Sequence, residues 1–303
     1  MASIRRILIS GATGFIGSVL VPKLAANFGN EILTINRDIT KAEQKFGIYK
    51  NVRYAESDDW EIVKAFNPEI VIHLAGLSTA NENQELIKEL VDSNITYGVL
   101  LLNALSKCDA FKFFVNTGSF SEYRHGPERI DCAYLYSATK AAFQNFVDYY
   151  SDKFGFKSVT AVLYSVYGGD RTVKRVMDYI AESVDAENPI DMTAGAQILD
   201  FIHVDDVADF YCKLIYNCAK LDKINRYIHV GTGNGIRIKD IALMIESICG
   251  SKCNINWSGI PYRARDIMCA VAPPCEELDL IDWSPRKTLE ATLQHKYGKS
   301  NDY

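Results

Sequence analysis

The stretch Ile7-Leu8-Ile9-Ser10-Gly11-Ala12-Thr13-Gly14-Phe15-Ile16-Gly17 decides the fold of this 303-residue chain. Its first residues are typical of a buried strand, and an apolar stripe at helical spacing follows the three glycines. Strand, glycine turn and helix in this order form a pyrophosphate site, because glycine lets the backbone approach the phosphates and the N–H groups of the helix start face the anion. The first gap of this G-x-x-G-x-x-G spacing is one residue longer than in the common G-x-G-x-x-G, and a plain tight turn is the alternative.

The first half of the chain alternates short apolar strands with amphipathic helices, which predicts an α/β fold with a Rossmann-type, doubly wound parallel sheet. The predicted strands are residues 5–10, 31–35, 52–55, 69–74, 111–116, 158–163 and 226–230. The predicted helices lie near residues 15–28, 59–66, 83–106 and 136–154.

The alternation of strands and helices loosens after Gly168, where prolines separate shorter elements. We therefore expect a smaller C-terminal substrate domain that is assembled from separate segments. The predicted Rossmann domain comprises residues 1–165 plus about 200–234, and the substrate domain comprises about 166–199 and 235–303.

The composition describes an ordinary globular protein, with 48% hydrophobic and 23% charged residues. A net charge of -5, with no run of lysines or arginines, argues against a nucleic-acid binder. The sequence has no apolar stretch long enough to span a membrane and no signal peptide, so we expect a cytoplasmic protein. The eight cysteines form no C-x-x-C pair and are predicted to be reduced thiols.

The end of the second strand bears on the choice of cofactor. A fold selective for NAD places an acid there to bind the ribose 2′-hydroxyl, whereas this chain has Asn36 followed by Arg37. A guanidinium suits a 2′-phosphate, so the sequence favours NADP(H) over NAD(H). Asp38 leaves the alternative open, because an acid one residue later can still reach the ribose.

Polar residues in the next strand and helix have two interpretations each. His73 lies inside a predicted strand that ends in small residues, and it is interpreted as a core histidine rather than a catalytic one. Asn94 falls on the buried stripe of the following helix. A buried amide must be paired, either with neighbouring backbone or within a polar relay at the active site.

Tyr136 and Lys140 are four residues apart at the start of a predicted helix, so their side chains share one face. A nearby ammonium favours phenolate and lowers the pKa of a tyrosine from about 10. Upstream, the strand predicted at residues 111–116 ends in Thr117-Gly118-Ser119, where a hydroxyl can hold a substrate oxygen. Glycine turn, hydroxyl and Tyr/Lys pair in this order predict an oxidoreductase site.

These residues resemble those of the extended short-chain dehydrogenase/reductase family, and the resemblance covers nearly the whole chain. It implies that Ser119, Tyr136 and Lys140 are catalytic, with Asn94 as a relay residue. It also implies a cofactor site formed by Gly11, Thr13, Gly14, Phe15, Ile16, Gly17, Arg37, Asp58, Leu74, Ala75, Gly76, Thr117, Tyr136, Lys140, Tyr164 and Val166. The substrate-binding residues that it implies are Ser119, Phe120, Ser121, Ser165, Arg171, Arg175 and Arg263, and it implies no metal.

Within the family, three stretches resemble the 4-ketoreductases of CDP- and dTDP-linked 4-keto-6-deoxy sugars. They are Ile35-Asn36-Arg37-Asp38, Asn116-Thr117-Gly118-Ser119-Phe120 and Val230-Gly231-Thr232-Gly233. The resemblance therefore implies NADPH-dependent reduction of a nucleotide-activated 4-keto-6-deoxyhexose by a homodimer. The alternatives are a nucleotide-sugar 4-epimerase and a non-catalytic, cofactor-sensing binding protein.

The chain departs from the family pattern at several positions. Leu199 replaces an arginine that contacts the diphosphate, and Ser165 replaces an asparagine. Phe120 and Ser121 stand where the dehydratases carry an Asp-Glu pair, and Glu122, one place later, is expected to face away from the site.

Two further segments resemble family motifs. Arg263 with Asp266 resembles an R-x-x-D phosphate contact, and Trp283-Ser284-Pro285 resembles a closing G-W-x-P. Asp200, His203, Asp205 and Asp206 are an alternative metal site. Asp205 or Asp206 is instead expected to cap the helix that follows.

Overall fold

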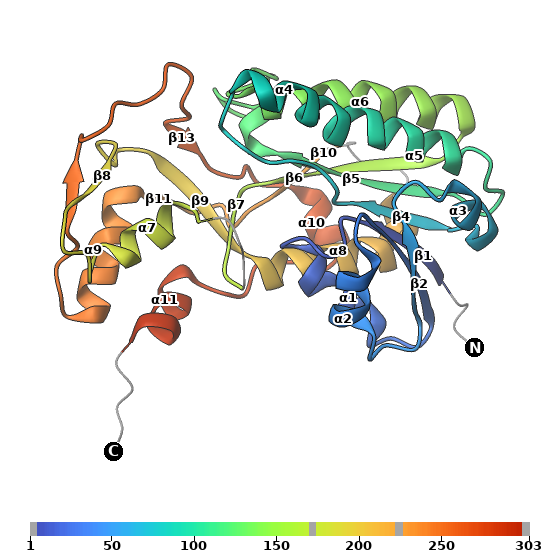
Figure 1. Ribbon diagram of the computed structural model, residues 1–303, viewed down its shortest axis with the longest axis horizontal. Coiled ribbons are helices and arrows are strands. Elements are labelled where there is room, and N and C mark those ends of the chain that lie inside the picture. Colours follow the sequence, from blue (N-terminus) through green and yellow to red (C-terminus); the bar gives the residue numbers. More distant parts are fainter. Residues whose placement is uncertain (1–4, 170–173, 222–226, 299–303) are drawn as a thin grey trace.

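A seven-stranded parallel sheet forms the larger part of the molecule (Figure 1). The computed structural model describes residues 5–169, 174–221 and 227–298. The strand order is β10-β6-β5-β4-β1-β2-β3, which confirms the predicted Rossmann-type sheet. The strands are β1 (Arg5–Ser10), β2 (Asn30–Asn36), β3 (Val52–Glu56), β4 (Ile70–His73), β5 (Phe113–Ser119), β6 (Lys157–Leu163) and β10 (Tyr227–Val230).

Helices cover both faces of this sheet, so its central strands are apolar on both sides. In β1, Ile7 and Ile9 pack into one core layer and Leu8 into the other, and all three are fully buried. One layer contains α1 (Gly17–Ala25), α2 (Ile39–Phe46) and α8 (Val204–Asn217). The opposite layer contains α3 (Trp60–Phe66), α4 (Gln84–Val91), the π-helix η1 (Asp92–Thr96), α5 (Tyr97–Leu105) and α6 (Leu135–Phe154).

The smaller part of the molecule contains two short sheets beside the carboxyl edge of the large one (Figure 1). Strand β9 pairs with β7, β11 and β13, and β12 pairs with β8. The strands are β7 (Ser165–Tyr167), β8 (Ile190–Met192), β9 (Ile198–His203), β11 (Gly235–Arg237), β12 (Ile255–Trp257) and β13 (Cys269–Ala270). The remaining helical elements are η2 (Phe120–Glu122), α7 (Val176–Glu182), η3 (Cys218–Leu221), α9 (Ile238–Cys249), α10 (Glu276–Leu280) and α11 (Leu289–Tyr297).

The predicted strands of the large sheet are all present, with ends shifted by up to three residues. The largest shift is in β5, which continues through Ser119, so that the hydroxyl residue lies in the strand rather than after it. The sequence interpretation missed α2 and did not anticipate that η1 interrupts the helix predicted at 83–106. The domain division remains a prediction, and its expected boundary near residue 200 falls inside β9.

No helix in the described ranges is long and apolar enough to cross a membrane. The cysteines of the chain are all free thiols.

Candidate active site

The glycine turn between β1 and α1 is built for close backbone contact. Gly11 has φ +72°, and a Cβ there would lie 2.6 Å from the Ala75 nitrogen at the end of β4. A Cβ at Gly17 would lie 2.5 Å from the carbonyl oxygens of Gly11 and Ala12. Among the described residues no side chain caps α1, whose N-cap is Ile16. Ser18, Val19 and Leu20 donate their N–H groups to the carbonyls of Gly14 and Ile16, so it is the backbone of the glycine turn before them that can face an anion. Thr13 and Phe15 complete this turn.

The residues at the end of β2 have separate partners. Asp38 caps α2, where its carboxylate accepts the Lys41 N–H at 2.9 Å. Asn36 is buried and donates from Nδ2 to the carbonyl and hydroxyl oxygens of Thr34, both at 2.9 Å. Its Oδ1 is buried and has no partner in the described part of the chain. Arg37 and Asp38 are both exposed, and the Asp38 carboxylate is used by the cap.

Arg37 and Asp58 both act electrostatically on Tyr97, the first residue of α5. Burial and the Asp58 carboxylate raise the pKa of Tyr97, and the Arg37 guanidinium lowers it. The family resemblance assigns both residues to the cofactor site.

The end of β4 lies against both the glycine turn and the catalytic helix. Leu74 N–H donates to the Ser10 carbonyl of β1 at 3.1 Å. A Cβ at Gly76 would lie 2.7 Å from Asn94 Oδ1 and 3.1 Å from Lys140 Nζ. Only glycine at position 76 leaves room for these two polar groups to lie together.

Asn94 belongs to η1, the π-helical turn. Its Oδ1 accepts the Leu77 N–H at 2.7 Å, and its Nδ2 donates to the Leu77 carbonyl at 3.0 Å and to Thr139 Oγ1 at 2.9 Å. The amide is buried, so these partners satisfy the requirement of a buried polar group. Asn94 thus joins the loop after β4 to α6, one residue before Lys140.

Ser119, Tyr136 and Lys140 come together at the carboxyl edge of the sheet. Burial raises the pKa of the Tyr136 phenol and Glu122 raises it further, whereas the Ser78 and Ser119 side chains lower it. The net direction is upward, whereas the sequence predicted a lowering by Lys140. A tyrosine with a raised pKa keeps its proton at neutrality, as a proton donor requires.

Lys140 is a buried cation, with 6% of its surface exposed. Burial lowers its pKa to about 8, and Glu122 opposes this change. The sequence interpretation placed Glu122 away from the site, and this was wrong. The 3₁₀ turn η2 reverses the chain directly after β5, so Glu122 folds back and accepts the Ser119 N–H at 2.6 Å.

Phe120, directly after β5, stacks on Tyr164 with ring centroids 5.6 Å apart. Ser121 Oγ lies 2.8 Å from Ser119 Oγ, within hydrogen-bonding distance. Thr117 faces α8, where its hydroxyl lies 2.7 Å from the Tyr211 hydroxyl.

The loop containing Arg263 packs on the segment before Tyr136. Tyr134 donates from its hydroxyl to Asp266 at 2.9 Å, and the Arg263 guanidinium lies 6.0 Å from the Tyr134 ring centroid. Arg175, which precedes α7, lowers the pKa of Tyr136. Arg171 lies outside the described residues.

The other substrate-domain positions lie further along the chain. Ser165 and Val166 form β7 and pair with Phe201 and Ile202 of β9. Leu199 packs into an apolar cluster with Tyr164.

The acidic residues between Asp200 and Asp206, at the end of β9 and the start of α8, connect segments that are far apart in the sequence. The buried Asp200 carboxylate accepts the N–H groups of Thr232 at 2.9 Å and Gly233 at 2.8 Å. The helix cap is His203 rather than an aspartate, because the Asp205 N–H donates to His203 Nδ1 at 3.1 Å. Asp205 pairs with Lys287 Nζ at 2.5 Å, and the Asp206 carboxylate accepts the Lys287 N–H at 2.9 Å. These contacts give each acid a structural partner.

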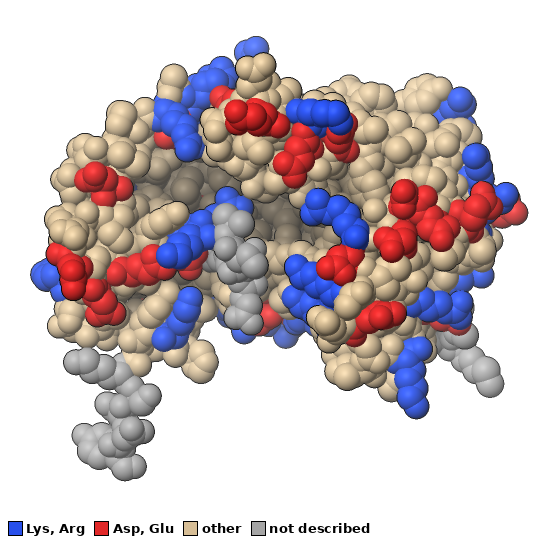
Figure 2. All heavy atoms as spheres, in the orientation of Figure 1, with Lys and Arg blue, Asp and Glu red and all other residues tan. Residues whose placement is uncertain are grey.

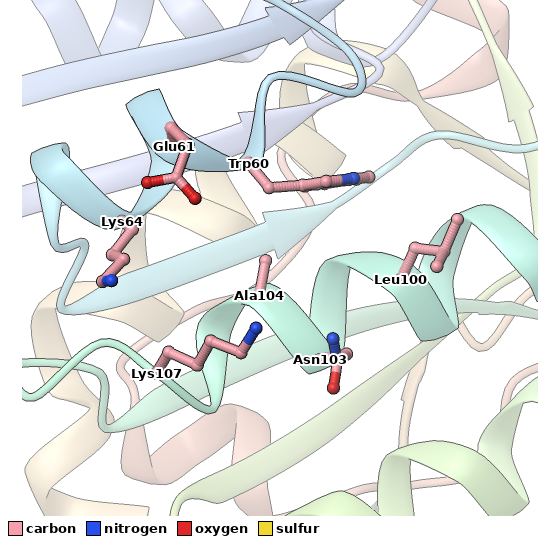
Figure 3. Close-up of a pocket in the computed structure, with 7 residues that line it drawn as sticks. All are labelled: Trp60, Glu61, Lys64, Leu100, Asn103, Ala104 and Lys107. Carbon is pink, nitrogen blue, oxygen red and sulfur yellow. The ribbon is translucent and has the colours of Figure 1, made fainter.

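One shallow pocket lies on the outer surface of the helical layer, between α3 and α5 and away from the triad (Figure 3). Its lining is Trp60, Glu61, Lys64, Leu100, Asn103, Ala104 and Lys107. Figure 2 shows a different hollow, between the two parts of the molecule, with both basic and acidic side chains around it.

The site fits a nicotinamide dinucleotide. The glycine turn admits the backbone approach that a pyrophosphate requires, no described side chain caps α1, and the buried Asn36 Oδ1 has no partner among the described residues. A hydroxyl, a phenol and a buried ammonium lie at the same sheet edge. Together the fold and the site define a nicotinamide-dependent enzyme of the Rossmann type.

The comparison with protein families agrees with a nicotinamide-dependent enzyme. Residues 7–231 match the NAD dependent epimerase/dehydratase family, and the chain belongs to this family. It is 29% identical over 305 residues to the CDP-abequose synthase of Salmonella typhimurium, covering 95% of this chain and 97% of that protein. It is 23% identical over 264 residues to the CDP-abequose synthase of Yersinia pseudotuberculosis, covering 87% and 90%.

The solved structures support the fold. The chain is similar to the UDP-glucuronic acid 4-epimerase of Bacillus cereus, solved with UDP-glucuronic acid and NAD. The TM-score is 0.83 at 20% identity, covering 96% of this chain and 98% of the other.

Proposed function

We propose that this protein reduces the 4-keto group of a nucleotide-activated 4-keto-6-deoxyhexose, with CDP or dTDP as the nucleotide and NADPH as the reductant. The observation that carries the proposal is the placement of Ser119 at the carboxyl end of β5 with Tyr136 and buried Lys140 four residues apart on α6. Similarity to CDP-abequose synthases over most of the chain supports this substrate class. Such a deoxy sugar serves surface polysaccharides such as the lipopolysaccharide O-antigen, and we propose a cytoplasmic location.

In the proposed mechanism, bound NADPH supplies the hydride that reduces the carbonyl carbon. The Ser119 hydroxyl and the Tyr136 phenol donate hydrogen bonds to the carbonyl oxygen. Tyr136 then transfers its proton to that oxygen as negative charge develops on it. The Lys140 ammonium stabilises the resulting phenolate and holds the nicotinamide ribose, while Asn94 fixes the loop beneath it.

The cofactor-binding residues support NADPH. Arg37 is exposed at the end of β2, where it can pair with a 2′-phosphate. Asp38 is occupied as the cap of α2, which argues against its use for a ribose 2′-hydroxyl. Arg263 and Arg175 would hold the diphosphate of the sugar nucleotide, with Phe120 and Tyr164 beside the sugar or base.

The side chains after Ser119 argue against dehydration. Removal of water across C5 and C6 needs an acid and a base, and Phe120 and Ser121 cannot supply them. Glu122, the nearest acid, is hydrogen-bonded to the Ser119 backbone instead.

A nucleotide-sugar 4-epimerase is the second enzymatic candidate, because it uses the same triad and the solved epimerase shares the fold. An epimerase regenerates its cofactor and holds it through each turnover, whereas a reductase must release NADP⁺. The complete triad argues against a non-catalytic binding protein.

Cofactor content and turnover test the proposal together. The protein should be purified largely free of nicotinamide, and should oxidise NADPH in the presence of CDP- or dTDP-4-keto-6-deoxyglucose. Tyr136→Phe should reduce turnover by about 10²–10⁴-fold while NADPH binding is retained. Tightly bound NAD⁺, with no consumption of added NADPH, would favour the epimerase.

A further inference from the structure

Glu122 is a buried acid in the wall of the catalytic site. It ends η2, has 3% of its surface exposed, and accepts the Ser119 N–H on Oε1 at 2.6 Å. A Cβ at Gly118 would lie 3.0 Å from this oxygen, so glycine leaves room for the carboxyl group. Burial of an acid costs free energy unless the carboxyl group has partners. The partners of Glu122 belong to the catalytic site.

The first contact fixes the catalytic serine. Ser119 is held at its backbone by Glu122 and at its hydroxyl by Ser121, whose N–H donates to Ser119 Oγ at 3.2 Å. The Glu122 carbonyl accepts the Asp131 N–H at 2.9 Å, which anchors the turn to the following segment. The position of the Ser119 hydroxyl beside Tyr136 therefore depends on the Glu122 side chain.

The second contact is electrostatic and reaches both other members of the triad. Helix α6, which carries Tyr136 and Lys140, packs against η2, and Glu122 acts electrostatically on both side chains. The Lys140 ammonium is buried, so a nearby anion favours its charged form. The same anion opposes a second negative charge on the Tyr136 oxygen.

Other ionisable groups surround this cluster from several elements. Arg175, before α7, favours the Tyr136 phenolate, whereas Glu122 opposes it. Tyr123 and Cys132 also interact with Glu122, Tyr211 of α8 interacts with Tyr136, and His73 of β4 interacts with Lys140. Among the described residues that act on the pKa of Tyr136, Glu122 is the one with a carboxyl group.

Burial raises the pKa of Glu122 to about 7, while the Ser119 N–H and Lys140 oppose the change. Below neutrality Glu122 is protonated and uncharged. The Tyr136 phenol also keeps its proton there, because the pH is far below its own pKa. Above neutrality Glu122 becomes an anion, in the pH range where loss of the Tyr136 proton would end proton donation.

We propose that Glu122 is a positioning residue that holds Ser119 by its backbone and, as an anion, keeps Tyr136 a phenol and Lys140 an ammonium, which biases the site toward ketone reduction. This inference rests on the proposed function, because a reductase must begin its cycle with a protonated tyrosine. An enzyme that begins by oxidising an alcohol needs the opposite state.

The test separates the charge of Glu122 from its hydrogen bond. Glu122→Gln keeps an oxygen acceptor for the Ser119 N–H but removes the charge. We expect the alkaline limb of its kcat profile to shift about one pH unit lower, because the anion that opposes a negative charge on Tyr136 is gone. Glu122→Asp keeps the charge on a shorter side chain, so we expect its alkaline limb to stay in place while kcat falls at every pH.

Glu82→Gln is the matched control, because Glu82 accepts a backbone N–H at the start of α6 from an exposed position. Its pH profile should equal that of the wild type. Equal alkaline limbs in the wild type and Glu122→Gln would overturn the inference, as would a Glu122→Asp profile shifted like that of Glu122→Gln.

A substrate-free measurement distinguishes failure of this inference from failure of the proposed function. NMR titration of protein with ¹³C-labelled tyrosine rings reports the pKa of Tyr136, with Tyr136→Phe identifying its resonance. Glu122→Gln should lower that pKa by about one unit. If the pKa falls but no 4-keto sugar is reduced, the substrate assignment fails and the electrostatic role of Glu122 stands. An unchanged pKa would refute that role whatever the substrate.

Discussion

Arg37 determines the predicted cofactor preference. Its side chain is exposed at the end of β2 and, like Asp58, acts electrostatically on Tyr97. Arg37→Ala should weaken NADPH binding by about ten- to a hundredfold, since a charge-assisted hydrogen bond contributes roughly 1.5–3 kcal/mol. NADH binding should change little. Dissociation constants for both cofactors, with Lys45→Ala in α2 as control, check this, and equal use of NADH and NADPH by the wild type would contradict it.

His73 should make the stability of the protein depend on pH. It is fully buried, its Nδ1 lies 2.7 Å from Ser10 Oγ, and burial together with Lys140 lowers its pKa to about 3. The unfolded chain binds a proton near pH 6.5 that the folded protein does not, so stability falls as pH decreases. Between about pH 7 and pH 5 the loss should be about 2 kcal/mol.

Urea unfolding at both pH values checks the contribution of His73. The variant His73→Phe removes this titration while keeping a ring of similar shape. The other histidines remain in both proteins, so the difference between the proteins isolates His73. A loss of stability in His73→Phe equal to that of the wild type would show that His73 does not cause it.

The triad could be predicted from local spacing, whereas Glu122 could not. Tyr136 and Lys140 share a face because the helix period brings positions i and i+4 together. The side chain of Glu122 is placed by η2, a single 3₁₀ turn that leaves no clear pattern in the sequence. If the residues after Ser119 continued the strand, alternation would place the Glu122 side chain on the opposite side. The helix cap at Asp38 could not be predicted either, because α2 was not recognised. This helix has eight residues and only two buried side chains, which is too few for an apolar stripe.

At the scale of elements, the π-helical turn η1 is the feature with the clearest mechanistic consequence. π-turns are rare, and inside α-helices they are frequently found at functional sites. Here η1 holds Asn94 against the backbone of Leu77 and the hydroxyl of Thr139. The apolar stripe predicted the burial of Asn94. It did not predict the π-turn, because one extra residue in the turn does not change the spacing of the apolar residues clearly.

Asn94→Ala should destabilise the protein by about 1–3 kcal/mol, because the Leu77 N–H and carbonyl lose their partners. The loop after β4 should then be less ordered, with weaker cofactor binding and lower turnover. Urea unfolding and NADPH affinity provide the measurements. Asn103→Ala, an exposed amide on α5, is the control, and equal effects of the two variants would refute the role given to η1.

At the scale of the whole molecule, the fold was predictable because its determinants are local. Apolar runs, the glycine turn and the helix stripes each fall within short stretches of sequence. The smaller part is built from strands of two to six residues contributed by separate segments, so pairings such as β7 with β9 have little local pattern.

A homodimer remains a prediction, supported by apolar side chains on the outer helical layer. Exposed residues on α4, α5 and α6 include Ile87, Val91, Leu100, Phe146 and Tyr149. Exposed apolar surface of this kind favours association. Light scattering should give the dimer mass at micromolar concentration, and Leu100→Glu with Phe146→Glu should shift the protein toward monomer. A monomeric wild type would contradict this prediction.

The central claim is that hydride passes from free NADPH to C4 of a nucleotide-linked sugar. The most direct measurement uses NADPH that carries deuterium at the transferable position of the nicotinamide, with CDP- or dTDP-4-keto-6-deoxyglucose as substrate. We predict one deuterium at C4 of the product for each NADPH oxidised, detected by NMR and mass spectrometry. A converted sugar without deuterium, and with NADPH unchanged, would contradict the reductase.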